Sequence, residues 1–217
     1  DDEAVHPSHA ATAVAHPVDP HVHFVRAPKA HGAIVPDACG QAPSTRGGPS
    51  PEANTLSMSA YTVIISKREL RTYTDQPLSE ATLRKILNAG RMSGSSRNRQ
   101  PWHFVVIRDR VRLRQLAACG RFTQHLPGAA AVVCIVVDGP GALFDAGRCA
   151  QNLMLGAWAL GVASCPATLH RDAEARALLG VPEGHVIATA VALGYPQPQG
   201  RGPVERAALR VLAGRGR

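Results

Sequence analysis

One stretch of the chain, residues 91–104, gathers residue types that could hold a small polar ligand. It contains Ser95, Ser96 and Asn98 together with three arginines, and it leads into the apolar run at residues 104–107. Small hydroxyl and amide side chains on a loop can approach a flat ring closely and hydrogen-bond its polar edge, while arginines offer paired donors to phosphate. The stretch therefore indicates a planar, polar-edged and phosphorylated ligand, of which nucleotides are one class.

Five further segments stand in a fixed order around this loop. Upstream lies a basic cluster that contains Lys67, Arg68 and Arg71. Downstream come a long apolar run, a Ser-Cys-Pro unit, an Ala-Leu-Gly-Tyr-Pro unit and an Arg-Gly-Pro unit, at residues 145–161, 164–166, 192–196 and 201–203. In this order the segments resemble the FMN-dependent nitroreductase family over residues 58–206. The chain is similar to a short, minimal member of that family.

The resemblance implies an α+β fold, a nitroreductase-like sandwich in which helices flank a central mixed β-sheet. It also implies a homodimer with FMN at the interface, where the basic cluster of one chain meets the loop of residues 95–98 from its partner. The implied activity is ping-pong hydride transfer, in which NADH or NADPH reduces FMN and an electron-poor acceptor (a nitroaromatic, a quinone or a similar compound) reoxidises it. No side chain is then catalytic, because N5 of the flavin carries the chemistry.

The same resemblance assigns roles within the basic cluster. Lys67 or Arg68 would hold the FMN phosphate, and Arg71 would lie at the flavin N1–C2 edge, where a cation favours the anionic reduced ring. Glu69 departs from the family pattern, in which a serine is common. An acid near a phosphate is unfavourable unless it pairs with Lys67 or Arg68. The alternative interpretation of this segment is an exposed charge cluster at a helix end.

Eight other residues belong to the implied FMN site. The loop residues would contact the flavin ring and the ribityl chain. The alternative interpretation is that these residues form an ordinary polar turn. The segment after the Ser-Cys unit would run beside the central ring and offer a backbone N–H to flavin N5. Arg201, late in the chain, would reach the phosphate. His125 falls near a position that makes a basic contact with the flavin edge in some family members. These residues are Ser95, Ser96, Asn98, His125, Pro166, Ala167, Thr168 (the N5 donor) and Arg201.

Other functions stay open on the sequence. Relatives of this family include deazaflavin-dependent enzymes and reductive dehalogenases, and Glu69 also suits a flavin-binding module without turnover. The net charge of +8 could attract a nucleic acid. However, the alternating arginines of residues 108–114 would spread around a helix, and no nucleic-acid motif is present. We expect neither a nucleic-acid partner nor a membrane partner.

Residues 1–57 differ in composition from the remainder. They hold six of the ten histidines and carry a net charge of −3, which leaves +11 for residues 58–217. Such a polar, aromatic-poor segment predicts a disordered tail next to one FMN-binding domain at 58–217. A native start at Met58 is an alternative. Compositional bias explains the histidines better than metal binding does, and we expect no metal.

Five scattered cysteines without a Cys-x-x-Cys pair predict neither disulfides nor a zinc site. We therefore expect a reducing, cytoplasmic location. Apolar periodicity and capping residues predict the regular elements. Helices are expected over residues 79–90, 110–119, 145–160 and 172–180, and strands over residues 102–107, 130–137, 162–166 and 186–193. Residues 58–72 are ambiguous, since residues 62–65 have strand propensity whereas the resemblance implies a helix.

Three details of this pattern have consequences for the site. Ser79 and Asp145 are expected to cap their helices, and Gly90 to end the first one. The 145–160 helix is apolar on more than one side, which independently favours a subunit interface. The connection at residues 139–144 is short where larger family members insert helices, so an open pocket is expected.

Overall fold

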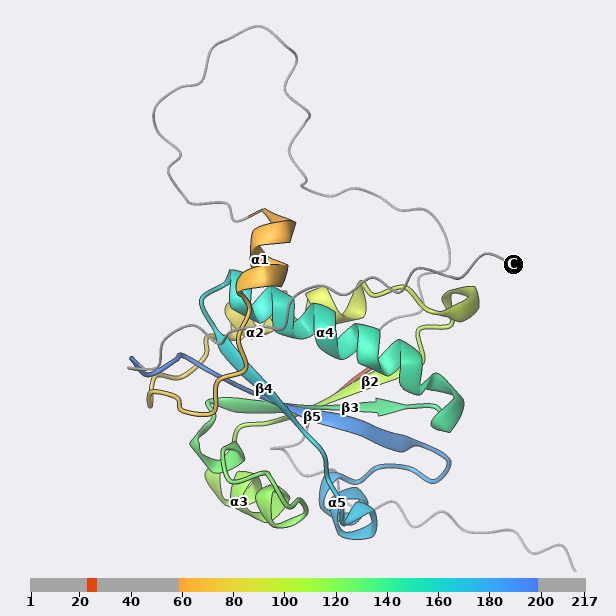
Figure 1. Ribbon diagram of the computed structural model, residues 1–217. Helices are drawn as coiled ribbons and strands as arrows, with labels where there is room; N and C mark the ends of the chain where they lie inside the picture. The colour runs from red at the N-terminus through yellow and green to blue at the C-terminus, as the bar shows by residue number, and fades with distance from the viewer. Residues whose placement is uncertain (1–22, 27–58, 199–217) are drawn as a thin grey trace, which may run out of the picture.

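The computed structural model describes residues 23–26 and 59–198, which form one β-sheet between two layers of helices (Figure 1). The strand order is β1-β2-β3-β5-β4. The strands are β1 (His23–Arg26), β2 (Trp102–Ile107), β3 (Ala131–Val137), β4 (Ala163–Ala167) and β5 (Val186–Gly194). Neighbouring strands pair antiparallel, and among the described residues a parallel contact occurs only as an isolated bridge between Glu69 and Ser164. The predicted α+β sandwich is confirmed.

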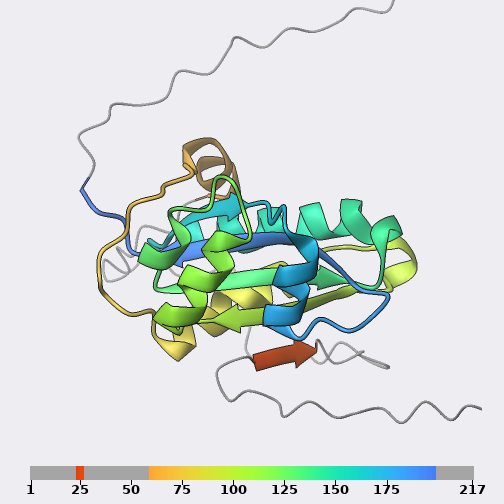
Figure 2. The same cartoon turned by 90° about the horizontal axis from the view of Figure 1, so that it is seen from below.

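The helices divide between the two faces of the sheet. On one face lie α2 (Glu80–Arg91) and α4 (Leu143–Ala159), with α1 (Ala60–Ser66) beside α4 (Figure 1). On the other face lie α3 (Arg110–Ala118) and α5 (Asp172–Leu179), seen in front of the sheet in Figure 2. Three short 3-10 turns complete the described elements, η1 (Ser96–Asn98), η2 (Leu126–Gly128) and η3 (Pro140–Ala142).

Strand β3 lies at the centre of the sheet and all of its residues are buried. Val133, Ile135 and Val137 pack into the core under α2 and α4. The alternate residues Val132 and Val136 pack into the core under α3 and α5. A strand covered on both faces needs no polar residue, which explains its continuous apolar sequence. The prediction of a central, doubly covered strand is confirmed.

Helix α2 begins as predicted but does not end as predicted. The hydroxyl of Ser79 accepts a hydrogen bond from the Thr82 N–H at 3.1 Å and caps the helix. Gly90, expected to end the helix, lies inside it and is buried. A Cβ added to Gly90 would lie 3.2 Å from the Leu153 Cβ of α4. The glycine therefore serves close helix packing rather than helix termination.

Helix α4 begins two residues earlier than predicted. It starts at Leu143, so Asp145 lies within the first turn and is not the cap. The Asp145 carboxylate is buried and accepts a hydrogen bond from the Ser96 N–H at 3.3 Å. The positive end of the helix dipole favours this buried charge. The side chain that was expected to cap the helix instead holds the neighbouring loop.

The ambiguous segment at residues 58–72 forms the short helix α1, as the resemblance implied. Ser59 caps it by accepting from the Thr62 N–H at 3.2 Å, and Val63 is buried. The β-branched residues at 62–65 therefore adopt a helix, because packing and capping outweigh a weak strand propensity. The other helices and strands agree with prediction to within one or two residues.

Strand β1 lies within the segment that was predicted to be a disordered tail. Its backbone pairs antiparallel with β2, from His23 opposite Val106 to Arg26 opposite His103. The rest of residues 1–57 lies outside the described residues, so the proposed division at residue 57 stays a prediction. No helix in the described part of the chain is long and apolar enough to cross a membrane.

The close approach of α2 and α4 generates a stability prediction. A Cβ at Gly156 would lie 2.6 Å from the Ala89 Cβ, whereas a Cβ at Gly147 of the same helix meets no atom within 4 Å. We expect Gly156→Ala to lower the free energy of unfolding by about 1–3 kcal/mol through overpacking. Gly147→Ala is the matched control and should be neutral or stabilising by up to about 1 kcal/mol. Urea unfolding of both variants tests this, and equal stabilities would refute the packing argument.

Candidate functional site

The basic cluster runs along the outer edge of the sheet beside β4. The Leu70 N–H donates to the Ser164 carbonyl at 3.2 Å, next to the bridge between Glu69 and Ser164. Strand β4 is an edge strand, so its open side is free to take this segment. The packing brings the cluster together with the Ser-Cys-Pro unit, two motifs almost one hundred residues apart in sequence.

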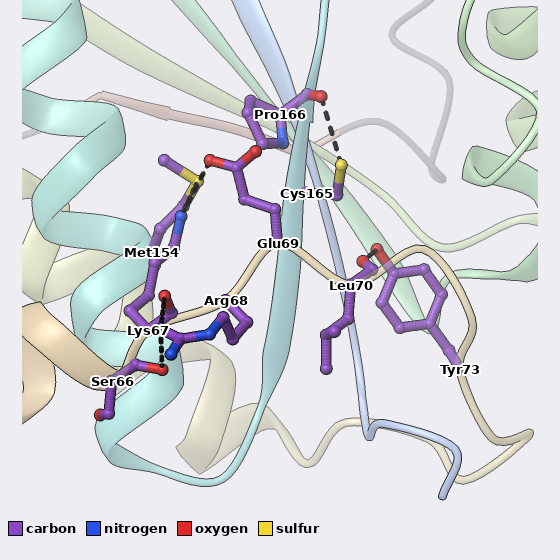
Figure 3. A network of polar contacts seen from close by, with 9 residues as sticks. All are labelled: Ser66, Lys67, Arg68, Glu69, Leu70, Tyr73, Met154, Cys165 and Pro166. Carbon is purple, nitrogen blue, oxygen red and sulfur yellow. Dashed lines mark hydrogen bonds and ion pairs between the residues drawn. The ribbon is translucent and has the colours of Figure 1, made fainter. Parts of the chain in front are cut away.

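Tyr73 fixes the cluster at its far end, a role that sequence reasoning missed. Its ring is buried against Gly194, where an added Cβ would lie 2.8 Å from ring atoms. Its hydroxyl donates to the Leu70 carbonyl at 2.7 Å (Figure 3). Burial raises the pKa of Tyr73, so the hydroxyl keeps its proton and remains a donor. The aromatic residue within the basic segment was the available signal for this anchor.

The two predicted phosphate ligands are both engaged with the protein. Lys67 is buried, and its Nζ lies 3.2 Å from Oε1 of Glu69 and 3.6 Å from Sδ of Met154 (Figure 3). The pairing of Glu69 with Lys67 is the condition under which an acid is tolerated in this cluster. Arg68 turns back to α1, where its Nη1 donates to the carbonyls of Ile65, Ser66 and Lys67 at 2.9–3.1 Å. A cation at these C-terminal carbonyls stabilises the helix end.

Arg71 lies within electrostatic reach of both His125 and Cys165. Arg71 is exposed, whereas His125 and Cys165 are buried. Burial raises the pKa of Cys165, and the positive charge of Arg71 opposes the shift. Burial also lowers the pKa of His125, and Arg71 lowers it further, against the opposing effect of a hydrogen bond between the ring and the Cys165 backbone. His125 is therefore neutral at neutral pH, and within the described part of the chain its buried Nε2 has no hydrogen-bond partner. An orphaned buried nitrogen next to an exposed guanidinium suits the polar edge of a ligand.

The end of β4 offers the third element of the site. Ala167 is buried, and its carbonyl accepts from the Thr189 hydroxyl at 3.2 Å. Thr168 follows the strand and is exposed. Its carbonyl packs so closely on Gly120 that an added Cβ there would lie 2.8 Å away. The Thr168 N–H makes no backbone hydrogen bond within the described residues, so it is available to an external acceptor.

The loop of residues 95–98 is held in an uncommon conformation. Arg97, Asn98 and Gln100 have φ near +50°, in the left-handed region that side chains avoid. The Ser95 hydroxyl accepts from the Gln100 N–H at 2.8 Å, and Asp145 accepts from the Ser96 N–H. Strained backbone persists only where surrounding contacts enforce it, and it clusters at functional sites. The loop leaves Ser96 and Asn98 exposed.

Helix α4 separates this loop from the basic cluster. The loop contacts Asp145 in the first turn, whereas Trp158 in the last turn donates from Nε1 to the Ser66 hydroxyl at 3.0 Å. A rise of 1.5 Å per residue puts these two ends about 20 Å apart. Figure 1 shows α1 over one end of α4 and the turn before β2 beyond the other end. The structure thus brings Lys67, Arg71, His125 and the end of β4 together, but not with the loop.

Arg201 lies outside the described residues, and its predicted contact with a phosphate stays a prediction. The remaining predicted residues, Pro166 and Ala167, lie on β4 beside the cluster.

Comparisons with known proteins agree with the fold. A model of the nitroreductase family matches residues 64–195. A protein of Archaeoglobus fulgidus, provisionally named NADH dehydrogenase/NAD(P)H nitroreductase, is 33% identical over 148 residues, which cover 63% of this chain and 85% of that protein. The NADH dehydrogenase of Thermus thermophilus is 28% identical over 73% of this chain and 98% of its own length. A crystal structure of a provisionally named nitroreductase from Desulfovibrio desulfuricans in complex with FMN is 29% identical, with a TM-score of 0.60 over 68% of this chain and 91% of that chain.

This chain belongs to the nitroreductase family and is an oxidoreductase. The predicted family is confirmed, and the expectation of FMN and a nicotinamide donor agrees with the names of these relatives.

The environment of His125 generates a prediction about pH. Its folded pKa is lowered below the unfolded value of about 6.5. As the pH falls below that value, His125 becomes protonated in the unfolded chain but stays neutral in the folded chain. The free energy of unfolding therefore falls by up to about 1.4 kcal/mol per pH unit until the folded pKa is reached. We expect the wild type to lose more stability than His125→Gln between about pH 7.5 and about pH 5.5.

Urea unfolding across this pH range measures the difference. His170→Gln, which changes an exposed histidine, controls for the loss of a histidine as such. Parallel pH profiles of the wild type and His125→Gln would show that folding does not lower the pKa of His125.

Proposed function

We propose that the protein is an FMN-dependent NAD(P)H oxidoreductase that reduces an electron-poor acceptor, such as a nitroaromatic or a quinone, by ping-pong hydride transfer. The proposal rests on three groups beside β4, namely an exposed cation, a buried nitrogen without a hydrogen-bond partner and a backbone N–H without a backbone partner. Arg71, His125 and Thr168 supply these three groups. The names of relatives support the proposal, because they include NADH dehydrogenase and a protein in complex with FMN.

The donors of the site fit the chemistry of FMN. The phosphate requires cationic donors, which Lys67 or Arg68 would supply together with Arg201. The polar edge of the ring requires fixed hydrogen-bond partners, a role that Arg71 and neutral His125 would fill. Lys67 is buried and pairs with the exposed Glu69, and a dianionic phosphate could compete with that carboxylate for the lysine.

FMN, when bound, supplies hydride acceptance and hydride donation at N5, and the protein supplies position and charge. The Arg71 guanidinium favours negative charge that develops at the N1–C2 edge. The Thr168 N–H orients the ring without requiring a particular side chain. His125 is neutral, so it can hydrogen-bond the ring edge without adding a second charge beside Arg71. The protein needs no acid or base of its own, because water can protonate the product.

We propose further that the working unit is a homodimer. The two ends of α4 lie about 20 Å apart, so Ser95, Ser96 and Asn98 would reach a ring at the basic cluster from a partner chain. Large apolar side chains are exposed on α1 and α4, among them Ile64 at 57% and Phe144 at 79%. Such exposed apolar surface indicates an interaction face, and a symmetric pair would complete two sites at once.

The visible spectrum of the purified protein tests the function. We expect flavin absorption bands that bleach when NADH or NADPH is added without oxygen and that return when a quinone is added. Bleaching would identify the donor. Flavin that stays oxidised with both donors would instead favour a deazaflavin-dependent enzyme or a binding module without turnover. Protein that takes up no FMN would contradict the proposal.

Complementation between two inactive variants tests the shared site. Arg71→Ala and Asn98→Ala should each lower the rate of quinone reduction by tenfold or more, on the order of 1.4 kcal/mol. If the two residues come from different chains of one site, a mixed dimer holds one intact site and one doubly altered site. Unfolding and refolding the variants together should then restore about a quarter of wild-type activity. The same treatment of each variant alone is the control. A mixture that stays as inactive as its components would place both residues in one chain's site.

A further inference from the structure

Three side chains outside the proposed flavin site meet where strands of the sheet begin and end. His103 is the second residue of β2, Asp138 follows β3, and His185 precedes β5. The His103 Nε2 lies 2.8 Å from Oδ1 of Asp138, and the His185 Nε2 lies 3.5 Å from the same oxygen. The two imidazole rings approach edge to face, with centroids 5.3 Å apart. One ligand atom from each residue lies within 4.8 Å of the other two.

The backbone around these residues is fixed. The sheet register sets His103 opposite Val136 on β3. The Asp138 N–H donates to the Pro101 carbonyl at 3.2 Å, and the His185 N–H donates to the Pro182 carbonyl at 3.3 Å. A guanidinium nitrogen of Arg176 also donates to the His185 carbonyl. The backbone positions of the three residues are therefore set by the fold.

We propose that His103, Asp138 and His185 form a binding site for a transition-metal dication of the Zn²⁺ class. Tetrahedral zinc with bonds of about 2.0–2.2 Å places neighbouring ligand atoms about 3.3–3.5 Å apart. The two observed distances to Asp138, 2.8 and 3.5 Å, bracket that value. Two imidazoles and one carboxylate select a transition metal over Mg²⁺ or Ca²⁺, which prefer oxygen ligands alone.

Two further features favour a metal over a simple ion-pair network. The His185 Nδ1 lies 3.3 Å from the Glu183 carbonyl, so it can donate there and leave the Nε2 lone pair for a metal. This second hydrogen bond is the usual companion of a metal-bound imidazole. Asp138 is also 58% exposed, which gives water access to a fourth position. The metal would tie together the ends of three adjacent strands, β2, β3 and β5.

Metal-dependent thermal stability of the full chain tests the site. A ligand that binds only the folded state raises the melting temperature, and the three residues come together only in the fold. After removal of metal with a chelator, Zn²⁺ at about one hundred times its Kd should raise Tm by about 5–10 °C. Mg²⁺ should raise it far less. Each variant is compared with its own metal-free Tm, and the histidines of residues 1–57 stay unchanged throughout.

His185→Gln and Asp138→Asn should abolish the rise, and His170→Gln, an exposed histidine outside the cluster, should keep it. Asp138 and His185 both lie in turns beside the strands. If one of the two variants fails to fold, the other still tests the site. A wild type without a Zn²⁺-dependent rise, or an equal rise in His185→Gln, overturns the proposal. Zinc-soaked crystals give an independent reading. An anomalous peak about 2 Å from both Nε2 atoms is expected, and a map without it also overturns the site.

Discussion

The packing of α4 against α2 and the sheet is the constraint on which the rest of the structure depends. Gly90 and Gly156 let the two helices approach so closely that an added methyl group would meet Leu153 or Ala89. In the proposed function, this helix would carry half of a ligand site at each end. Its first turn holds the strained loop through Asp145, and its last turns hold the basic cluster through Met154 and Trp158. If the two halves belong to one flavin site, as proposed, the length of this helix would require a second chain to complete it.

Two of the cations in the basic cluster are engaged by partners within the protein. A buried lysine is costly unless a partner satisfies it, and Lys67 has that partner in Glu69. The residue that departs from the family pattern thus has a physical reason to be there. Arg68 uses its charge at the end of α1, which leaves Arg71 as the exposed cation of the segment. Next to Arg71, burial keeps His125 neutral, so the site presents one positive charge and several neutral donors to a ligand edge.

Much of the fold could be predicted from the sequence because its signals were local. The apolar run of β3 indicated a strand covered on both faces, and Ser79 marked the start of α2. Predictions about Gly90 and Asp145 were wrong for a common reason. Glycine near a helix end and an acid near a helix start are typical of caps, but each was needed by a neighbouring element, α4 in one case and the 95–98 loop in the other. Local preference gives way when a tertiary contact is worth more.

The class of fold and the family could be predicted from the sequence, because hydrophobic period and ordered motifs follow the chain. The residues proposed to contact a flavin stay a prediction. Only the tertiary structure decided which of those residues meet one another. It placed Arg71 within electrostatic reach of His125, and it set the loop at residues 95–98 at the far end of α4. It also gathered His103, Asp138 and His185 from three strand ends, which no spacing in the sequence indicated. Such meetings depend on strand order and helix length, and these are fixed by packing between distant segments.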